Sequence, residues 1–147
     1  MAINLQFYKL KLVKENCARY DVQKTIRSKE DIVNLAKVLE INSEAEEVLI
    51  LVTVDTKNNI TGIFEVSRGS LNASIVHPRE IFKRAILNNA AGIFLIHNHP
   101  SGNSNPSKND DEVTERIKKA GELMSIELLD HIIAGNTYYS YLENYKI

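Results

Sequence analysis

The residues best suited to chemistry in this chain are two histidines and one aspartate. His97 and His99 follow directly after the apolar run 91–96, and Asp110 comes after the turn-rich segment 100–106. Residues two apart in a strand point to the same face, so a strand end would aim both imidazoles at one point. Two neutral imidazoles and a carboxylate, with a fourth position left to water, are the ligand set of a catalytic zinc site.

Three elements must position these ligands: a buried strand over 91–96, a tight loop, and a helix that begins at Ser107 and carries Asp110 in its first turn. Each part has a plainer interpretation. Ser107 and Asp110 also have the spacing of a helix capping box, and a His-x-His pair is common on exposed strand ends. We favour the metal site because the full spacing occurs in the strand–loop–helix context that it requires.

Hydrolysis at such a site needs a general base beside the metal. A zinc ion lowers the pKa of its bound water from about 15.7 towards 7, and a nearby carboxylate then takes the proton. Glu65 is the predicted base, because it lies in the predicted strand 60–67 on the face opposite Phe64 and Val66. Ser107 is predicted to donate a hydrogen bond to the developing oxyanion. The commoner role of a lone glutamate is a surface ion pair.

Two other polar stretches allow more than one interpretation. Residues 77–80 are either a phosphate or partner contact, or simply the polar start of a helix at Pro78. Asp130 and His131 stand inside the apolar run 128–133, where a buried polar pair needs partners. They could support the metal ligands or be satisfied by the backbone.

The remaining patterns predict an α/β protein of one domain over residues 1–147, a three-layer sandwich with a central mixed β-sheet flanked by helices. A capping box at Ser28 and Asp31 starts the first predicted helix. The continuous apolar run 48–54 predicts a central strand, paired in a hairpin with 60–67. Further strands are expected over 3–13, 72–76, 126–133 and 138–142.

Composition limits the classes of function. The chain is 44% hydrophobic and 25% charged, with a net charge of -1, which argues against a generally basic nucleic-acid binder. It has a single cysteine, Cys17, and lacks any apolar run long enough to span a membrane or to form a signal peptide. These features predict a cytoplasmic protein. They leave its oligomeric state undetermined.

The loop 97–110 and several further stretches resemble one known family, the RadC branch of the JAB/MPN metalloprotease superfamily, whose metal-binding sequence is the JAMM motif. The matching stretches are 54–58, 67–71, 77–82, 89–91 and 128–133. The resemblance implies a JAB/MPN fold, which is cytidine-deaminase-like, and one catalytic Zn²⁺ held by His97, His99 and Asp110. It also carries the transition-state role to Ser107 and the catalytic glutamate to Glu65.

The superfamily cleaves amide or isopeptide bonds, so the resemblance implies a metallopeptidase acting on a peptide or protein. The RadC branch has a DNA-repair name, but its usual helix-hairpin-helix segment is not expected in residues 1–45, where a strand and a helix are predicted instead. The alternative is a DNA-repair or mobile-element module that keeps the fold and metal without turnover. A metal-dependent nuclease is disfavoured, because the residues that name the His-Asn-His nucleases are spread over a ββα unit.

Overall fold

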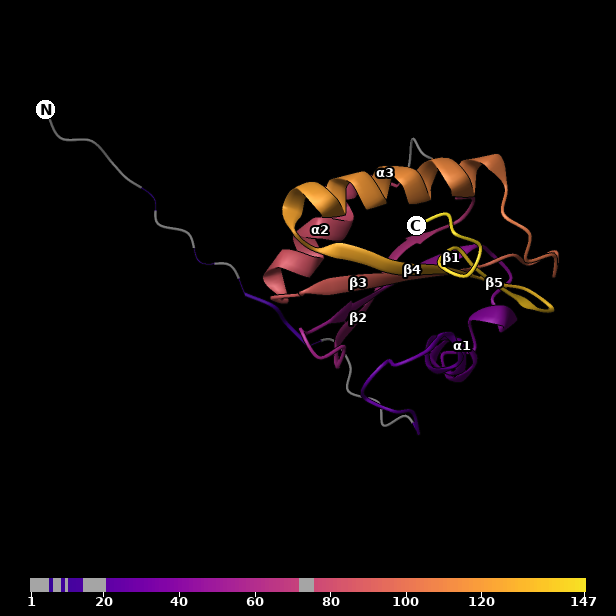
Figure 1. Cartoon of the computed structure of the whole chain (residues 1–147), viewed down its shortest axis with the longest axis horizontal. Coiled ribbons are helices and arrows are strands. Elements are labelled where there is room, and N and C mark those ends of the chain that lie inside the picture. The colour runs from indigo at the N-terminus through magenta and orange to yellow at the C-terminus, as the bar shows by residue number, and fades with distance from the viewer. Residues whose placement is uncertain (1–5, 7–8, 10, 15–20, 72–75) are drawn as a thin grey trace, which may run out of the picture.

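The computed structural model describes residues 6, 9, 11–14, 21–71 and 76–147. Its centre is a five-stranded mixed sheet with the strand order β2-β1-β3-β4-β5. Helices α2 and α3 cover one face of the sheet and α1 covers the other (Figure 1). The elements are α1 Lys29–Val38, η1 Ile41–Ser43, β1 Val48–Val54, β2 Ile60–Arg68, α2 Pro78–Leu87, β3 Gly92–Asn98, α3 Lys108–Met124, β4 Glu127–Ala134 and β5 Tyr138–Ser140. The predicted three-layer α/β sandwich is confirmed.

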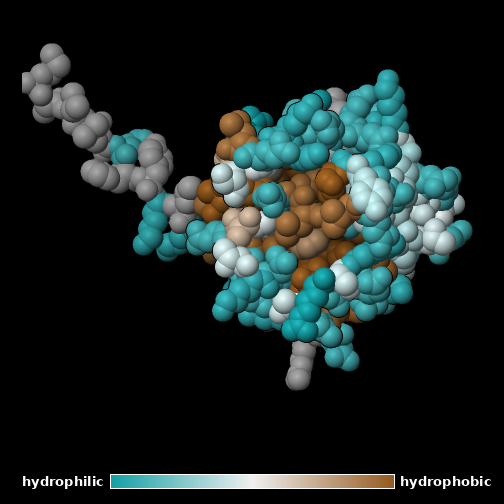
Figure 2. All heavy atoms as spheres, viewed as in Figure 1, coloured by the Kyte–Doolittle hydropathy of each residue, from teal (hydrophilic) through white to brown (hydrophobic). Residues whose placement is uncertain are grey.

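The two central strands are the most apolar in sequence, which explains their place in the sheet. β3 is buried along its whole length and β1 everywhere except Ile50, which is partly exposed. Alternate residues feed two separate cores: Leu51 and Leu95 pack under α2 and α3, whereas Val52 and Ile96 pack over α1. Figure 2 shows hydrophobic side chains across the middle of the molecule and hydrophilic ones over the helices. The expectation that 48–54 is buried on both faces is therefore confirmed.

One crossover connection places the loop 99–107 at the carboxyl end of the central strand β3. β3 and β4 are parallel neighbours, and α3 joins them, so the chain leaves the end of β3, turns and enters α3. Gly102 has a φ of +82°, a left-handed conformation that suits glycine within this turn. The carboxyl end of β3 and the first turn of α3 consequently lie side by side.

The other expected elements agree in part. The capping box of Ser28 and Asp31 is present at the start of α1. β5 ends at Ser140, earlier than predicted, because the chain turns there and the Leu142 amide donates to the carboxylate of Asp130. The predicted strands 3–13 and 72–76 fall largely outside the described residues, and the described positions within them belong to no strand. Within the described part of the chain, no helix is long and apolar enough to cross a membrane.

Candidate metal centre

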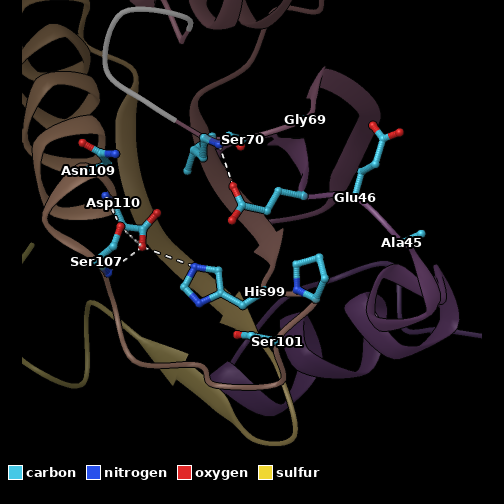
Figure 3. A pocket seen from close by; sticks show the side chains of 12 residues that line it. Ala45, Glu46, Gly69, Ser70, His99, Ser101, Ser107, Asn109 and Asp110 are labelled. Atoms are coloured by element: carbon cyan, nitrogen blue, oxygen red, sulfur yellow. Dashed lines mark hydrogen bonds and ion pairs between the residues drawn. The ribbon is translucent and has the colours of Figure 1, made fainter.

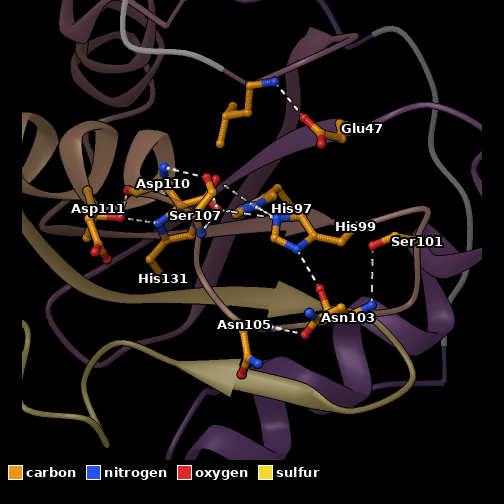
Figure 4. A network of polar contacts seen from close by, with 12 residues as sticks. Glu47, His97, His99, Ser101, Asn103, Asn105, Ser107, Asp110, Asp111 and His131 are labelled. Atoms are coloured by element: carbon orange, nitrogen blue, oxygen red, sulfur yellow. Dashed lines mark hydrogen bonds and ion pairs between the residues drawn. The ribbon is translucent and has the colours of Figure 1, made fainter.

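His97, His99 and Asp110 meet at the junction of β3 and α3, as the sequence predicts (Figure 4). Their potential ligand atoms all lie within 4.8 Å of one another. The two Nε2 atoms are 3.0 Å apart. Asp110 places Oδ1 3.2 Å from Nε2 of His97 and Oδ2 3.3 Å from Nε2 of His99. Four-coordinate zinc with bonds of about 2.0–2.2 Å separates its ligands by roughly 3.3–3.6 Å, so these spacings fit one small cation.

The proton on His99 can be located from its neighbours. Nδ1 of His99 lies 2.7 Å from the carbonyl oxygen of Asn103. A carbonyl only accepts, so Nδ1 carries a hydrogen, and in the neutral ring Nε2 presents a lone pair. That lone pair faces the carboxylate of Asp110 and the ring of His97 without a hydrogen of its own. A cation among the three groups, or a proton on one of the two rings, must join them, and the three donors fit a metal ion.

The carboxylate of Asp110 also caps α3. Its Oδ2 accepts from the backbone N–H of Ser107 at 2.6 Å and from the Ser107 hydroxyl at 2.7 Å. The Asp110 amide donates in return to the Ser107 oxygen at 3.2 Å, which completes a capping box. The two interpretations of Ser107 and Asp110 are therefore compatible, because one carboxylate serves both arrangements.

Electrostatics favour the charged form of Asp110. Burial by itself raises the pKa of this carboxyl group, but hydrogen bonds and positive charge at His97, together with the Ser107 donors, outweigh burial and hold the pKa well below its usual range. Burial lowers the pKa of His131, the neighbour of His97, well below its ordinary value. The centre therefore combines an ionised carboxylate with a neutral imidazole behind it.

A pocket of about 680 Å³ opens onto the centre (Figure 3). His99, Ser107 and Asp110 line one part of this pocket, and Glu47 lines another part of it. Glu47 Oε2 accepts a hydrogen bond of 2.6 Å from the Leu71 amide, which fixes the carboxylate in place. The remaining lining residues are Ala45, Glu46, Gly69, Ser70, Leu71, Pro100, Ser101 and Asn109.

The structure does not bring Glu65 to this pocket. Glu65 pairs with Ile50 across the β1–β2 ladder, whereas His97 pairs with Leu49 on the other side of β1. Ile50 and Leu49 are consecutive and point to opposite faces, so Glu65 and His97 lie on opposite faces of the sheet. The Glu65 side chain is 47% exposed and forms an ion pair of 3.0 Å with Arg68.

Asn98 links β3, which carries His97, to the segment that carries Glu47. Its side-chain Oδ1 accepts from the Val48 amide at 2.7 Å, and its Nδ2 donates to the Glu46 carbonyl at 2.9 Å. These two groups flank Glu47 in the chain. A single buried amide, standing between His97 and His99, thus fixes the backbone on both sides of Glu47. This contact could not be predicted from sequence, because it depends on β1 and β3 being neighbours.

We expect Asn98→Ala to lower the free energy of unfolding by about 1–3 kcal/mol, because the substitution leaves the buried Val48 amide without its partner. Denaturant unfolding of the metal-free protein measures this loss. Asn109→Ala is the matched control, since Asn109 is exposed on α3 beside the same pocket and its loss should cost less than about 0.5 kcal/mol. Equal stability of the two variants would contradict the proposed role of the Asn98 contacts.

The stretches with open interpretations now have neighbours. Asp130 is buried and accepts from the Ser140 hydroxyl at 2.6 Å and the Leu142 amide at 3.0 Å, so its partners are structural. His131 instead contacts His97. Glu80 forms ion pairs with Lys83 at 2.8 Å and Arg84 at 3.2 Å, which favours a polar helix start over a phosphate contact in this stretch.

Comparisons with known proteins agree with this geometry. A family model described as "RadC-like JAB domain" matches residues 26–146. A "UPF0758 protein" of Clostridium beijerinckii is 50% identical over 111 residues, covering 76% of this chain and 48% of the relative. A "UPF0758 protein" of Desulfitobacterium hafniense is 45% identical over 118 residues, covering 80% and 52% respectively. The chain thus spans about half the length of the curated relatives that it matches.

Proposed function

The chain belongs to the RadC-like JAB domain family, and we propose that it is a zinc-dependent hydrolase of the JAMM type that cleaves amide or isopeptide bonds in a peptide or protein. The observation that carries this proposal is the convergence of His97, His99 and Asp110 on one point beside an open pocket. Imidazole and carboxylate ligands suit zinc, and an open side is what distinguishes catalytic from structural zinc sites.

His97, His99 and Asp110 would hold the zinc ion. When bound, zinc supplies Lewis acidity, which activates water and polarises a carbonyl group. The protein must supply the proton transfers and the orientation. Three ligands from the end of β3 and the start of α3 would leave the side toward the pocket for water and substrate.

We propose Glu47 as the general base in place of Glu65. One oxygen of Glu47 is held by the Leu71 amide, and the other would take a proton within the pocket. As the C–N bond breaks, the same oxygen would return that proton to the leaving amine. An amide leaving group needs this protonation, because an amine anion is a poor leaving group.

Ser107 remains our candidate for stabilising the oxyanion. Its hydroxyl lies in the pocket wall and donates to Asp110 in the structure. The hydroxyl can rotate about its C–O bond, so its hydrogen is available to a developing negative charge on the substrate. In this role, the capping serine would act on the substrate while its backbone N–H continues to bind Asp110.

The test of the metal site is elemental analysis of the purified protein after zinc reconstitution and dialysis. We expect about one zinc per chain in the wild type and essentially none in His97→Ala, which removes a ligand. His77→Ala is the matched control, because His77 is an exposed histidine at the start of α2 and should not affect zinc content. A wild type without zinc after reconstitution would overturn the proposed function.

A further inference from the structure

Behind the candidate ligands lies a chain of buried hydrogen bonds that returns to the centre where it began. Nδ1 of His97 lies 2.8 Å from Nε2 of His131. Nδ1 of His131 lies 2.6 Å from the hydroxyl oxygen of Thr114. That hydroxyl donates at 2.7 Å to the backbone carbonyl of Asp110, one turn earlier in α3. Both intervening residues are buried: His131 is 0% exposed and Thr114 is 2% exposed.

The direction of every hydrogen in this chain follows from its last member. The Asp110 carbonyl can only accept, so the single hydroxyl hydrogen of Thr114 is used there. Thr114 must then accept from Nδ1–H of His131, which leaves Nε2 of His131 as an acceptor. A neutral His97 must therefore carry its hydrogen on Nδ1 and present an unprotonated Nε2 to His99 and Asp110.

We propose that Thr114 and His131 are positioning residues that hold His97 in the tautomer required for binding a metal ion. This inference rests on the proposed metal centre. Neither residue is a ligand, but a ligating imidazole is usually fixed by the partner of its second nitrogen. The ring of His131 is itself held in place by Tyr141, which stacks on it at 5.1 Å with an interplanar angle of 12°.

The competing explanation is that His131 and Thr114 merely satisfy each other in the core. The two explanations differ in what the loss of the Thr114 hydroxyl should change. If the contact only supports the fold, its loss lowers stability and leaves metal affinity alone. If it fixes the tautomer of His97, its loss also lets the His131 ring exchange its donor and acceptor atoms, and the zinc affinity falls.

Thr114→Val separates these explanations, because it keeps the size of the side chain and removes only the hydroxyl. Loss of such an outer contact typically weakens metal binding by about 10–100-fold, and we expect that change in the zinc Kd measured by competition with a chelator. Thr53→Val is the matched control. Thr53 is also fully buried, and its hydroxyl oxygen accepts a hydrogen bond of 2.6 Å from the side chain of Asn88. Thr53 lies near the end of β1 that is remote from the centre. We expect its zinc Kd to stay within threefold of the wild type.

A second pair of variants tests the acceptor role of His131. His131→Leu removes the acceptor for His97 Nδ1–H, and we expect a loss of zinc affinity at least as large as that of Thr114→Val. His131→Gln can still accept through its carbonyl oxygen, so it should recover part of the affinity. Because both residues act through one chain, the double variant His131→Leu/Thr114→Val should bind zinc no more weakly than His131→Leu alone.

The outcomes distinguish this inference from the proposed function. A wild type that binds zinc together with a Thr114→Val variant of unchanged zinc Kd would overturn the positioning role and leave the metal centre intact. An equal loss of affinity in Thr53→Val and Thr114→Val would also overturn it, because a general loss of stability would then explain both. A wild type that fails to bind zinc would overturn the proposed centre and this inference together.

Discussion

Glu47→Gln is expected to lower kcat for peptide or isopeptide hydrolysis by about 10²–10⁴-fold, the usual contribution of a general acid or base. Glutamine keeps the shape of the side chain and can still accept from the Leu71 amide, so the pocket should be preserved. It cannot take a proton from water at neutral pH. Zinc content should remain that of the wild type, because Glu47 is not among the grouped ligands. Two quantities are measured for the variant and the wild type. They are kcat on a fluorogenic amide that the wild type cleaves, and zinc content by elemental analysis.

Glu65→Gln is the matched control for this experiment. It makes the same chemical change on the opposite face of the sheet, at an exposed residue paired with Arg68. We expect its kcat to stay within about threefold of the wild type, since surface ion pairs contribute little beyond their own site. A large loss in Glu65→Gln with normal turnover in Glu47→Gln would restore the base role to Glu65. Wild-type zinc binding without turnover on any amide would instead favour a module that keeps the metal without catalysis.

Asp110→Ala should have two separable effects. The first is a loss of zinc affinity of more than about 100-fold, larger than that typical for a residue outside the ligand set. The second is a loss of about 0.5–2 kcal/mol in the stability of the metal-free protein, because the substitution also removes half of the capping box with Ser107. Chelator competition measures the first effect, and denaturant unfolding in the presence of a chelator measures the second.

Glu112→Ala is the control for Asp110→Ala. Glu112 is an exposed acid in the same helix, two residues further on, with only a 3.8 Å ion pair to Lys108. Glu112→Ala should leave zinc affinity unchanged. It should change the free energy of unfolding by no more than about 0.5 kcal/mol. If Asp110→Ala bound zinc like the wild type, Asp110 would be a helix cap only. If it lost zinc but no stability, the capping contribution would be refuted.

The same carboxylate predicts how stability depends on pH in the metal-free protein. The pKa of Asp110 in the folded state lies well below its unfolded value of about 3.9. Its contribution to stability is therefore fully present above the unfolded pKa and is lost as the pH falls towards the folded pKa. Asp110→Ala should consequently show a weaker loss of stability upon acidification below about pH 5 than the wild type.

The ligands could be predicted from sequence because they are local. His97, His99 and Asp110 lie within fourteen consecutive residues, and a strand end, a tight loop and a capped helix start bring them together without help from distant segments. The three-layer fold followed from the same patterns, because uninterrupted apolar runs mark central strands. Resemblance to a family added the expectation that the metal is zinc.

The residues around the ligands could not be predicted, because they depend on which strands are neighbours. Glu47 reaches the pocket because β1 runs antiparallel beside β3, so that the start of one lies at the end of the other. His131 reaches His97 because β4 is the parallel neighbour of β3. Hydrophobic patterns do not specify either neighbour.

The prediction of Glu65 shows the same difficulty in a single strand. Alternation correctly placed Glu65 opposite Phe64 and Val66. Those two residues pack into the core beneath α2 and α3, which is the side of the sheet that carries the metal centre. Glu65 therefore points toward the other side. The pattern defined two faces of β2, and only the folded sheet showed which of them meets α3.

The shared use of Asp110 has a consequence for how this family can diverge. Its carboxylate joins the His97–His99 pair to a helix cap built with Ser107. Selection for a stable helix would preserve this aspartate even in a descendant that bound no metal. The histidines have no comparable second use in the capping box, so they would drift first. In distant relatives, the histidines rather than the aspartate should therefore reveal whether the ancestral chemistry survives.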